Sequence, residues 1–321
     1  MENSIHRTSS QSVNVSILIS LYNYAESVNE LHESISDVLN GLKKSYEIVY
    51  IDDGSTDSTY EQLQNIASKD NRVRVVKMRS SFGEASNLEA GLHYSGGEII
   101  VYLSGRVRVN FHQIPDLLGA IDAGEDLVVG WRFPRRDGFL NRFTSGLFNW
   151  IVGRITRIRL HDINSSIIVT RRTVLESISF YGDLYNFIPI IVRWQGYRVT
   201  EVKIEQLPGS FRKSKYPQKY IQRILDIITV IFLMRYSKKP IHFLGFLGTI
   251  FVIAGLGIEI YLFIYRILQM GPIAGRPLLI LGALLLVIGI QMISIGLLGE
   301  MIIFTHAGDI KDYNIENILN P

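Results

Sequence analysis

Cysteine is absent from the 321 residues of this chain. The protein therefore cannot form disulfides, use a thiol nucleophile or build a cysteine-ligated zinc site. The chain also lacks a surplus of one charge, with 33 Lys and Arg against 30 Asp and Glu. Because no global positive field favours nucleic acid as a partner, any anion must be bound by a local cluster of cations.

The N-terminal region lacks an apolar stretch. Residues 1–14 are polar, so they do not form a secretory signal, and we expect them to be disordered. Across the whole chain 47% of residues are hydrophobic and only 20% are charged. This composition allows a large buried core together with membrane segments.

The first half of the chain alternates short apolar runs with amphipathic runs. The alternation predicts a mostly parallel sheet that helices cover on both faces. We expect strands at 15–20, 47–51, 73–78, 98–103 and 126–130, and helices at 25–42, 57–68 and 83–94.

The second of these strands ends in an acidic, glycine-containing turn, where Asp52 and Asp53 precede Gly54. Ligands of open α/β sheets bind beyond the carboxyl ends of the strands, so this turn predicts a ligand-binding edge. The alternative is a strand end followed by a helix N-cap at Ser55 or Asp57. An N-cap explains the glycine and the hydroxyls, but it does not explain two adjacent acids.

The C-terminal third contains two long apolar runs, 243–265 and 278–298. Each is long enough to cross a bilayer as a helix, and we expect membrane helices at 241–266 and 277–304. A buried helical hairpin of a soluble protein is the alternative. Glu259 lies inside the first run, and either a functional role or a helix-packing role accounts for it.

Basic residues interrupt the apolar sequence just before the first run, at Lys219, Arg223 and Arg235. This pattern favours an amphipathic helix at the membrane interface over 216–240, although a solvated helix face would use the same residues. Because positive charge gathers on this side of the spans, we expect the N-terminal domain, both termini and the 305–321 tail to be cytoplasmic.

Several motifs occur together in one order along the chain. They include Ile51-Asp52-Asp53-Gly54-Ser55-Thr56-Asp57, Gly130-Trp131-Arg132, Arg159-Leu160-His161-Asp162 and Lys213-Ser214-Lys215-Tyr216, followed by the paired spans. From about Val13 to Phe304 the chain resembles the family 2 glycosyltransferases of the GT-A fold, in the branch that glycosylates polyprenyl phosphates. The resemblance implies a GT-A domain over 15–215, with a Rossmann-like, mostly parallel sheet, followed by the interfacial helix and two transmembrane helices.

The resemblance also implies inverting transfer of a sugar from a nucleotide-sugar, expected to be a UDP-sugar, to undecaprenyl or a similar polyprenyl phosphate. The enzyme would be a homo-oligomer in a bacterial inner membrane. Its donor-binding residues would be Tyr22, Asn23, Glu26, Asp52, Asp53, Arg79 and Ser104.

Asp162 matches an acid close to the donor sugar and the acceptor phosphate, where it would act in catalysis by orienting the complex, and its alternative role is a helix or turn cap. Guanidinium groups suit bidentate phosphate contacts, and a solvated loop or general attraction to the membrane surface would use the same cations. The acceptor phosphate would meet Arg132, Arg135, Arg136, Lys213 and Lys215.

One motif of the family is missing. Members carry Asp-x-Asp after the fourth strand, where two carboxylates bind Mg²⁺ or Mn²⁺ on the donor diphosphate, whereas this chain reads Ser104-Gly105-Arg106. Serine and arginine supply no anionic metal ligand. Glu84 also stands where Lys or Gln is more usual.

Two hypotheses follow from this loss. In the first, Arg106 replaces the metal as the positive charge on the diphosphate, and the enzyme is metal-independent. In the second, the chain is a catalytically degenerate membrane protein that assembles with an active homologue. A processive polysaccharide synthase fits less well, because it would need the missing carboxylates.

Overall fold

The computed structural model describes residues 13–104, 109–134, 146, 153–154, 160–163, 165, 167–178, 182–207, 240–273 and 275–306. The expected interfacial helix, most of the expected N-terminal tail and the end of the C-terminal tail lie outside the described residues. The chain divides into two compact units, 1–227 and 228–321.

The first unit contains a seven-stranded mixed sheet in the order β3-β2-β1-β4-β6-β5-β7. Strands β1 to β4 pair in parallel, β6 runs antiparallel to both β4 and β5, and β7 is parallel to β5 at the edge. The strands are β1 (Val15–Leu21), β2 (Tyr46–Asp52), β3 (Val73–Lys77), β4 (Ile99–Ser104), β5 (Leu127–Arg132), β6 (Ile167–Arg171) and β7 (Val199–Ile204).

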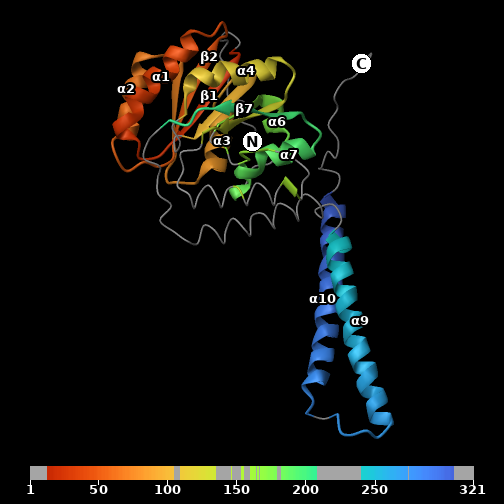
Figure 1. The fold of residues 1–321 in the computed structure, drawn as a ribbon. Helices are drawn as coiled ribbons and strands as arrows, with labels where there is room; N and C mark the ends of the chain where they lie inside the picture. Colours follow the sequence, from red (N-terminus) through yellow and green to blue (C-terminus); the bar gives the residue numbers. More distant parts are fainter. Residues whose placement is uncertain are drawn as a thin grey trace. The chain divides into compact units, whose positions relative to one another are not determined.

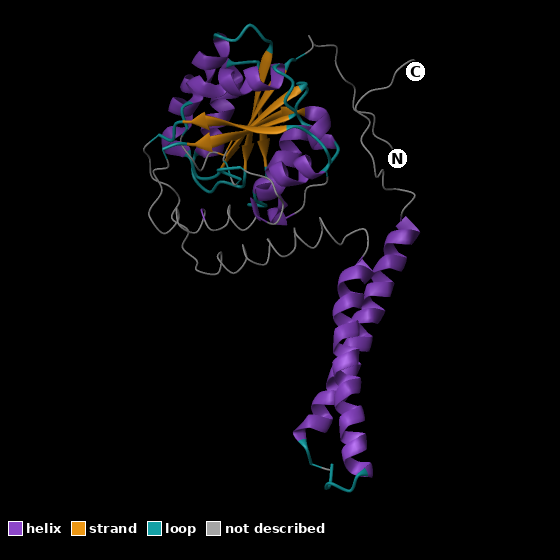
Figure 2. Ribbon diagram, turned by 45° about the vertical axis from the view of Figure 1, so that its right-hand side comes forward, coloured by secondary structure: helices purple, strands orange, loops and turns teal. Residues whose placement is uncertain are grey.

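Helices cover both faces of this sheet (Figure 2). The α-helices are α1 (Val28–Asn40), α2 (Thr59–Lys69), α3 (Glu84–His93), α4 (Ile114–Asp122), α6 (Arg172–Glu176) and α7 (Ile188–Trp194). In the described part of the chain, the 3₁₀ helices η1 (Ala25–Ser27), η2 (Phe111–Gln113) and η3 (Gly182–Phe187) lead into α1, α4 and α7.

Strand residues alternate between the two covered faces. Ile17 and Val101 share one buried cluster with Ile35 of α1 and Leu117 of α4. The opposite face carries α3, where a Cβ added at Gly91 would lie 3.0 Å from the Leu18 side chain. A helix that approaches a sheet so closely needs a residue without a side chain at the contact.

The start of the sheet is held together by a polar cluster. The Ser16 hydroxyl donates a 2.6 Å hydrogen bond to Glu47 and accepts one of 2.8 Å from the Gly97 N–H. The same Glu47 oxygen accepts from the Gly96 N–H. These contacts tie β1, β2 and the turn before β4 at the end of the sheet opposite the predicted ligand-binding edge.

The second unit is a hairpin of two apolar helices, α9 (Pro240–Ile267) and α10 (Pro277–His306) (Figure 1). Both helices are long and apolar enough to cross a membrane. They pack through glycines: a Cβ at Gly248 would lie 2.6 Å from the Gly289 carbonyl oxygen, and a Cβ at Gly255 would lie 2.8 Å from that of Gly282. Glu259 packs over Gly282, whose added Cβ would meet the Glu259 carboxylate at 2.5 Å.

The predicted mostly parallel, helix-covered sheet and the two apolar helices are confirmed. The sequence did not predict β6 and β7, and the observed spans extend the expected ones by a few residues. The placement of Glu259 against Gly282 accounts for a packing role, whereas a functional role stays a prediction.

Candidate functional site

The loops that follow β1 and β2 are joined at the carboxyl end of the sheet. The Asn23 side-chain oxygen accepts a 2.8 Å hydrogen bond from the Thr56 N–H, and the Asn23 N–H donates to the Ser55 hydroxyl at 2.9 Å. Asn23 has a φ of 50°, a left-handed conformation that asparagine tolerates better than most residues. Its side chain therefore shapes the edge of the site by holding two loops together.

Asp57 reinforces this junction. Its carboxylate accepts hydrogen bonds from the Ala25 N–H at 3.2 Å and from the Thr59 N–H and hydroxyl at 3.0 and 2.5 Å. Burial alone would raise the pKa of the Asp57 carboxyl, but these hydrogen bonds to the ionised form outweigh burial and lower the pKa.

Asp53 is buried and fixes the segment that leads into α3. One carboxylate oxygen accepts from the Phe82 N–H at 2.9 Å and the Gly83 N–H at 3.4 Å, and the other accepts from the Ser81 hydroxyl at 2.7 Å. Gly54 follows with a φ of 70°, and a Cβ there would lie 2.7 Å from the Ser80 backbone. The acidic turn therefore holds the 80–83 segment tightly against the end of β2.

Asp52 is fully buried at the last position of β2. Its Oδ1 accepts from the Ser55 N–H at 3.1 Å, while Oδ2 has no hydrogen-bond partner in the part of the chain that the structure describes. Both acids thus stand at the predicted edge, and the described contacts give them a structural role there. Their contact with a nucleoside stays a prediction.

Several polar side chains hydrogen-bond to one another near the end of β4. The Asn87 amide donates to the Ser20 hydroxyl at 2.9 Å, and Ser20 is hydrogen-bonded in turn to the Tyr102 phenol. Tyr102 donates to Glu84, and the Ser104 hydroxyl donates to the other oxygen of the same carboxylate at 3.0 Å. Burial, reinforced by the negative charge of Glu84, raises the pKa of Tyr102 well above its usual value. The phenol therefore stays neutral and acts as a donor.

Arg132 and Asp162 form a buried bidentate ion pair. The guanidinium Nε lies 2.6 Å from one Asp162 oxygen, and Nη2 lies 2.9 Å from the other. Only 6% of Arg132 and 1% of Asp162 is exposed. The sequence assigned these residues separately, to the acceptor phosphate and to the reaction centre, and the structure places them in direct contact.

Trp131 and His161, which precede Arg132 and Asp162 in the sequence, belong to a second group of contacting side chains. His161 stacks on Trp131 with ring centroids 4.1 Å apart, and both its backbone N–H and its ring contact Glu201. The Lys203 ammonium lies 5.0 Å from the centre of the Trp131 ring. Trp131 and Arg132 alternate across β5, so the aromatic stack and the ion pair project from opposite faces of the strand.

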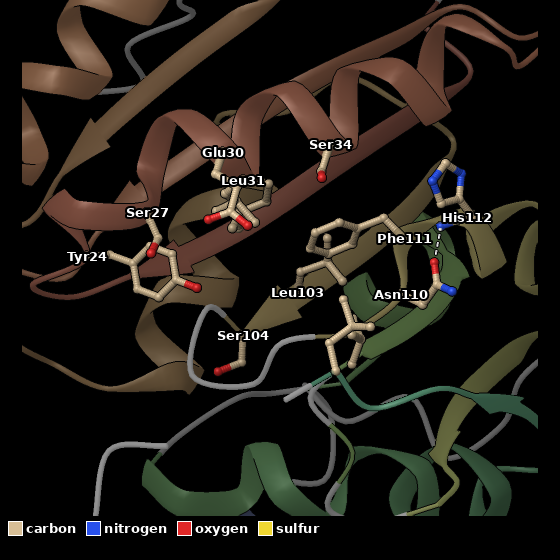
Figure 3. Close-up of a pocket in the computed structure, with 13 residues that line it drawn as sticks. Tyr24, Ser27, Glu30, Leu31, Ser34, Leu103, Ser104, Asn110, Phe111 and His112 are labelled. Carbon is tan, nitrogen blue, oxygen red and sulfur yellow. Dashed lines mark hydrogen bonds between the residues drawn. The ribbon is translucent and has the colours of Figure 1, made fainter. Parts of the chain in front are cut away.

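A cavity of about 440 Å³ opens beside Ser104 (Figure 3). Figure 3 shows side chains on and just before α1 facing side chains from the end of β4 and the 109–112 segment. The polar lining residues are Tyr24, Ser27, Glu30, Ser34, Ser104, Asn110 and His112, and the apolar ones are Ile19, Leu31, Leu103, Val109, Phe111 and Leu207.

The other predicted site residues are more dispersed. Tyr22 is partly exposed, whereas Glu26 and Arg79 are exposed. Five predicted residues lie outside the described part of the chain: Arg106, Arg135, Arg136, Lys213 and Lys215. Of the residues that line the cavity, sequence reasoning singled out Ser104 alone, and it missed the pairing of Tyr102 and Ser104 with Glu84. The unusual glutamate at position 84 was the signal that could have found this pairing.

The residues described at the Asp-x-Asp position do not fit the family's metal. Ser104 offers a hydroxyl that is already donated to Glu84. Among the described residues no cluster of three or more His, Asp or Glu side chains could hold a metal ion. Mg²⁺ and Mn²⁺ favour several oxygen ligands that include carboxylates, and the one carboxylate described in contact with Ser104, that of Glu84, already accepts hydrogen bonds from Tyr102 and Ser104.

Residues 16–179 match the glycosyl transferase family 2. The chain belongs to this family. It is also 31% identical over 305 residues to the dodecaprenyl-phosphate galacturonate synthase of Rhizobium johnstonii, a match that covers 93% of this chain and 90% of the relative. This family 2 chain therefore has a polyprenyl-phosphate sugar synthase as a full-length homologue, which confirms the predicted branch.

Solved structures agree on the fold. Glucosyl-3-phosphoglycerate synthase from Mycobacterium tuberculosis with Mn²⁺ and uridine-diphosphate-glucose has a TM-score of 0.54 at 18% identity, covering 71% of this chain and 84% of that chain. The same enzyme with Mn²⁺, uridine-diphosphate and glucosyl-3-phosphoglycerate has a TM-score of 0.53 at 16% identity, covering 72% and 86%. At these identities the likeness shows the GT-A fold alone.

Proposed function

We propose that this protein transfers a sugar from a nucleotide-sugar to a polyprenyl phosphate at the cytoplasmic face of a membrane, with inversion at the anomeric carbon. The observation that carries the proposal is the extent of the match to the dodecaprenyl-phosphate galacturonate synthase, which covers 93% of this chain. A match of that extent includes the apolar helices as well as the sheet.

The chemistry needs few groups from the protein. A phosphate oxygen of the lipid attacks the anomeric carbon, the bond from that carbon to the diphosphate breaks on the opposite face, and the nucleoside diphosphate leaves. Because the lipid phosphate is already ionised near neutral pH, it needs positioning rather than a general base. The diphosphate gains charge as it leaves, so it needs a nearby cation.

Arg106 is our candidate for that cation. It stands two residues after Ser104, at the third position of the missing Asp-x-Asp motif, where the family has its second acid. A guanidinium carries a permanent positive charge and can contact two phosphate oxygens at once. In this proposal the reaction runs without a metal ion.

The buried ion pair supplies orientation near the acceptor. The two carboxylate oxygens of Asp162 accept hydrogen bonds from Nε and Nη2 of Arg132. These two bonds fix the plane of the guanidinium at the end of β5. Arg135 and Arg136 follow shortly after in sequence, and Lys213 and Lys215 precede the expected interfacial helix. We assign these cations to the lipid phosphate and propose that Asp162 orients them through Arg132.

The test is transfer of label into lipid. Purified protein in detergent is incubated with undecaprenyl phosphate and radiolabelled UDP-glucose, UDP-galacturonic acid or UDP-N-acetylglucosamine, with EDTA or with Mn²⁺. Label in the organic phase in EDTA supports the proposal, and Arg106→Ala should then lower the rate at least about a hundredfold. Arg193→Ala, at an exposed position of α7, is the matched control for loss of one arginine.

A second function is favoured by the same departure from the family. Loss of the Asp-x-Asp carboxylates would suit a non-catalytic protein that assembles with an active homologue. Absence of label with every donor, in the presence or absence of Mn²⁺, would support this function and contradict catalysis. Mass measurement in detergent would separately test the expected homo-oligomer.

A further inference from the structure

The cavity described above has an apolar floor. Ile19, Leu103 and Val109 are its most deeply buried lining residues, with exposed fractions of 1%, 3% and 2%. Leu31 of α1 and Phe111 of η2 also line it, and both are partly buried against the same hydrophobic cluster (Figure 3). A volume of about 440 Å³ lies within the range of small-ligand sites.

Hydrogen bonds within the chain fix the walls of this cavity. The Asn110 N–H donates to the Glu205 carbonyl oxygen at 3.0 Å, and the Glu205 N–H donates to the Gln113 side chain at 2.7 Å. On the α1 side, the Tyr24 N–H donates to the Thr59 hydroxyl at 2.8 Å. Because the walls are held by the chain itself, a ligand does not have to order them when it binds.

The cavity lies on the same face of the sheet as the Arg132 guanidinium. Leu103 of β4 and Val128 of β5 belong to one buried cluster, and alternation along the strand places Arg132 on the same face as Val128. Strands β4 and β5 both run antiparallel to β6, which lies between them, so they end at the same edge. Two strand spacings amount to roughly 10 Å. The cavity is therefore close to the arginine that we assign to the lipid phosphate.

The apolar floor limits what the cavity can bind. The donor of the proposed reaction carries hydroxyls, a base and a diphosphate, and burying such polar groups without hydrogen bonds is unfavourable. Ile19, Leu103 and Val109 offer these groups no side-chain partner. An isoprenoid chain has no polar group to satisfy, and it gains about fourfold in affinity for each methylene that it buries. The chain attached to the acceptor phosphate is therefore the better occupant.

We propose that this cavity binds the first isoprene units of the polyprenyl phosphate, while the phosphate itself lies toward Arg132. The inference rests on the proposed function, and it adds a site for the lipid chain within the sheet unit. Ser34 lines the cavity and is exposed, so it marks the rim and gives an accessible position for a chemical probe.

The first experiment measures how affinity depends on chain length. Full-length protein in phosphatidylcholine nanodiscs is titrated calorimetrically with inorganic phosphate and with dimethylallyl, geranyl and farnesyl phosphate, whose isoprenoid chains increase in length. Affinity should rise at least about tenfold from dimethylallyl to geranyl phosphate. Leu31→Gln should remove most of that rise, because it places a polar amide in the apolar wall. Leu42→Gln is the matched control, since Leu42 is partly buried against the same cluster but is not among the lining residues.

The second experiment probes the cavity without removing an apolar contact. Because the chain has no cysteine, Ser34→Cys introduces a single thiol at the rim. Glu33→Cys introduces one at an exposed position that is not among the lining residues. Geranyl phosphate should slow the reaction of Ser34→Cys with a maleimide and leave that of Glu33→Cys unchanged, whereas UDP should slow neither. If Leu31→Gln does not fold, this measurement decides alone.

Three results would contradict the expectation in distinguishable ways. Protection of Ser34→Cys by UDP rather than by geranyl phosphate would identify a nucleotide as the occupant and overturn the inference. The same chain-length dependence in the wild type and in Leu31→Gln, with no protection of the thiol, would overturn it while leaving the proposed function intact. If the wild type binds the prenyl phosphates no more tightly than inorganic phosphate, the lipid acceptor of the proposed function is itself contradicted.

Discussion

The two compact units bring their elements together by opposite means. In the sheet unit, polar side chains reach across strands and loops, as Asp53 does to the 80–83 segment and Arg132 does to Asp162. In the helical hairpin, α9 and α10 approach because side chains are missing at Gly248, Gly255 and their partners. A polar contact is lost when one partner changes, whereas a glycine contact is lost when an atom is added.

The largest expected effect is in the sheet unit, from breaking the buried ion pair. Asp162→Asn leaves the Arg132 guanidinium buried beside a neutral amide, which should destabilise the unit by about 3–5 kcal/mol. Urea unfolding followed by tryptophan fluorescence would measure the change. Asp116→Asn, on the surface of α4, is the matched control. An unchanged unfolding midpoint would show that the pair contributes little to folding.

The next largest effect is expected in the helical hairpin. Here an added atom, rather than a lost polar contact, weakens the packing. Gly289→Ala places a methyl group 2.6 Å from the Gly248 carbonyl oxygen and 2.7 Å from a Val252 methyl group, so the helices must separate. The expected cost is about 1–3 kcal/mol. Thermal loss of helical circular dichroism in detergent would detect it, and a melting curve identical to the wild type would contradict close packing at this position.

A smaller effect concerns the loop junction at Asp57. Folding lowers the pKa of this carboxyl, so its stabilising contribution is present above the ordinary value of 3.8 and is lost as the pH falls through the lower folded value. Asp57→Asn weakens hydrogen bonds to the ionised carboxylate and should cost about 1 kcal/mol at neutral pH. Stability measured between pH 7 and pH 2 should therefore depend less on pH in the variant, and parallel curves would refute the assignment.

The smallest expected effect is a gain in the hairpin. A Cβ added at Gly257 meets no atom within 4 Å. Because glycine is a poor helix former, Gly257→Ala should stabilise α9 by up to about 1 kcal/mol. This variant is also the matched control for Gly289→Ala, since the same atom is added where space exists. Destabilisation by both would mean that the hairpin tolerates no added side chain at either position.

The parts of the fold that follow local patterns were predictable from the sequence. Strands β1 to β5 are short runs rich in apolar residues, and α9 and α10 are long apolar segments, so each carries its signal within itself. Strand β6 has five residues and inserts antiparallel between β4 and β5. Its neighbours are remote in sequence, and no local pattern indicates that arrangement.

In the candidate site, the positions of the two acids were predictable from the sequence, and their contacts were less so. Asp52 and Asp53 stand at the expected edge because a strand end fixes them there. The pairing of Arg132 with Asp162 joins residues 30 positions apart, and that of Glu84 with Ser104 joins residues 20 apart. Such pairs depend on how loops return to the sheet, which neither periodicity nor motif spacing encodes.

The polar cluster of Ser16, Glu47, Gly96 and Gly97 fixes the start of β1 and β2, so the number of residues after it determines how far each strand extends. Ser16 and Glu47 are paired in register, as are Leu21 and Asp52, so each strand runs five residues from the cluster to the predicted ligand-binding edge. Five extended residues span roughly 17 Å. Inserting one residue into either strand between these points would shift its end by about 3 Å and turn every later side chain to the other face. Length variation between related chains should therefore be confined to the loops beyond Leu21 and Asp52.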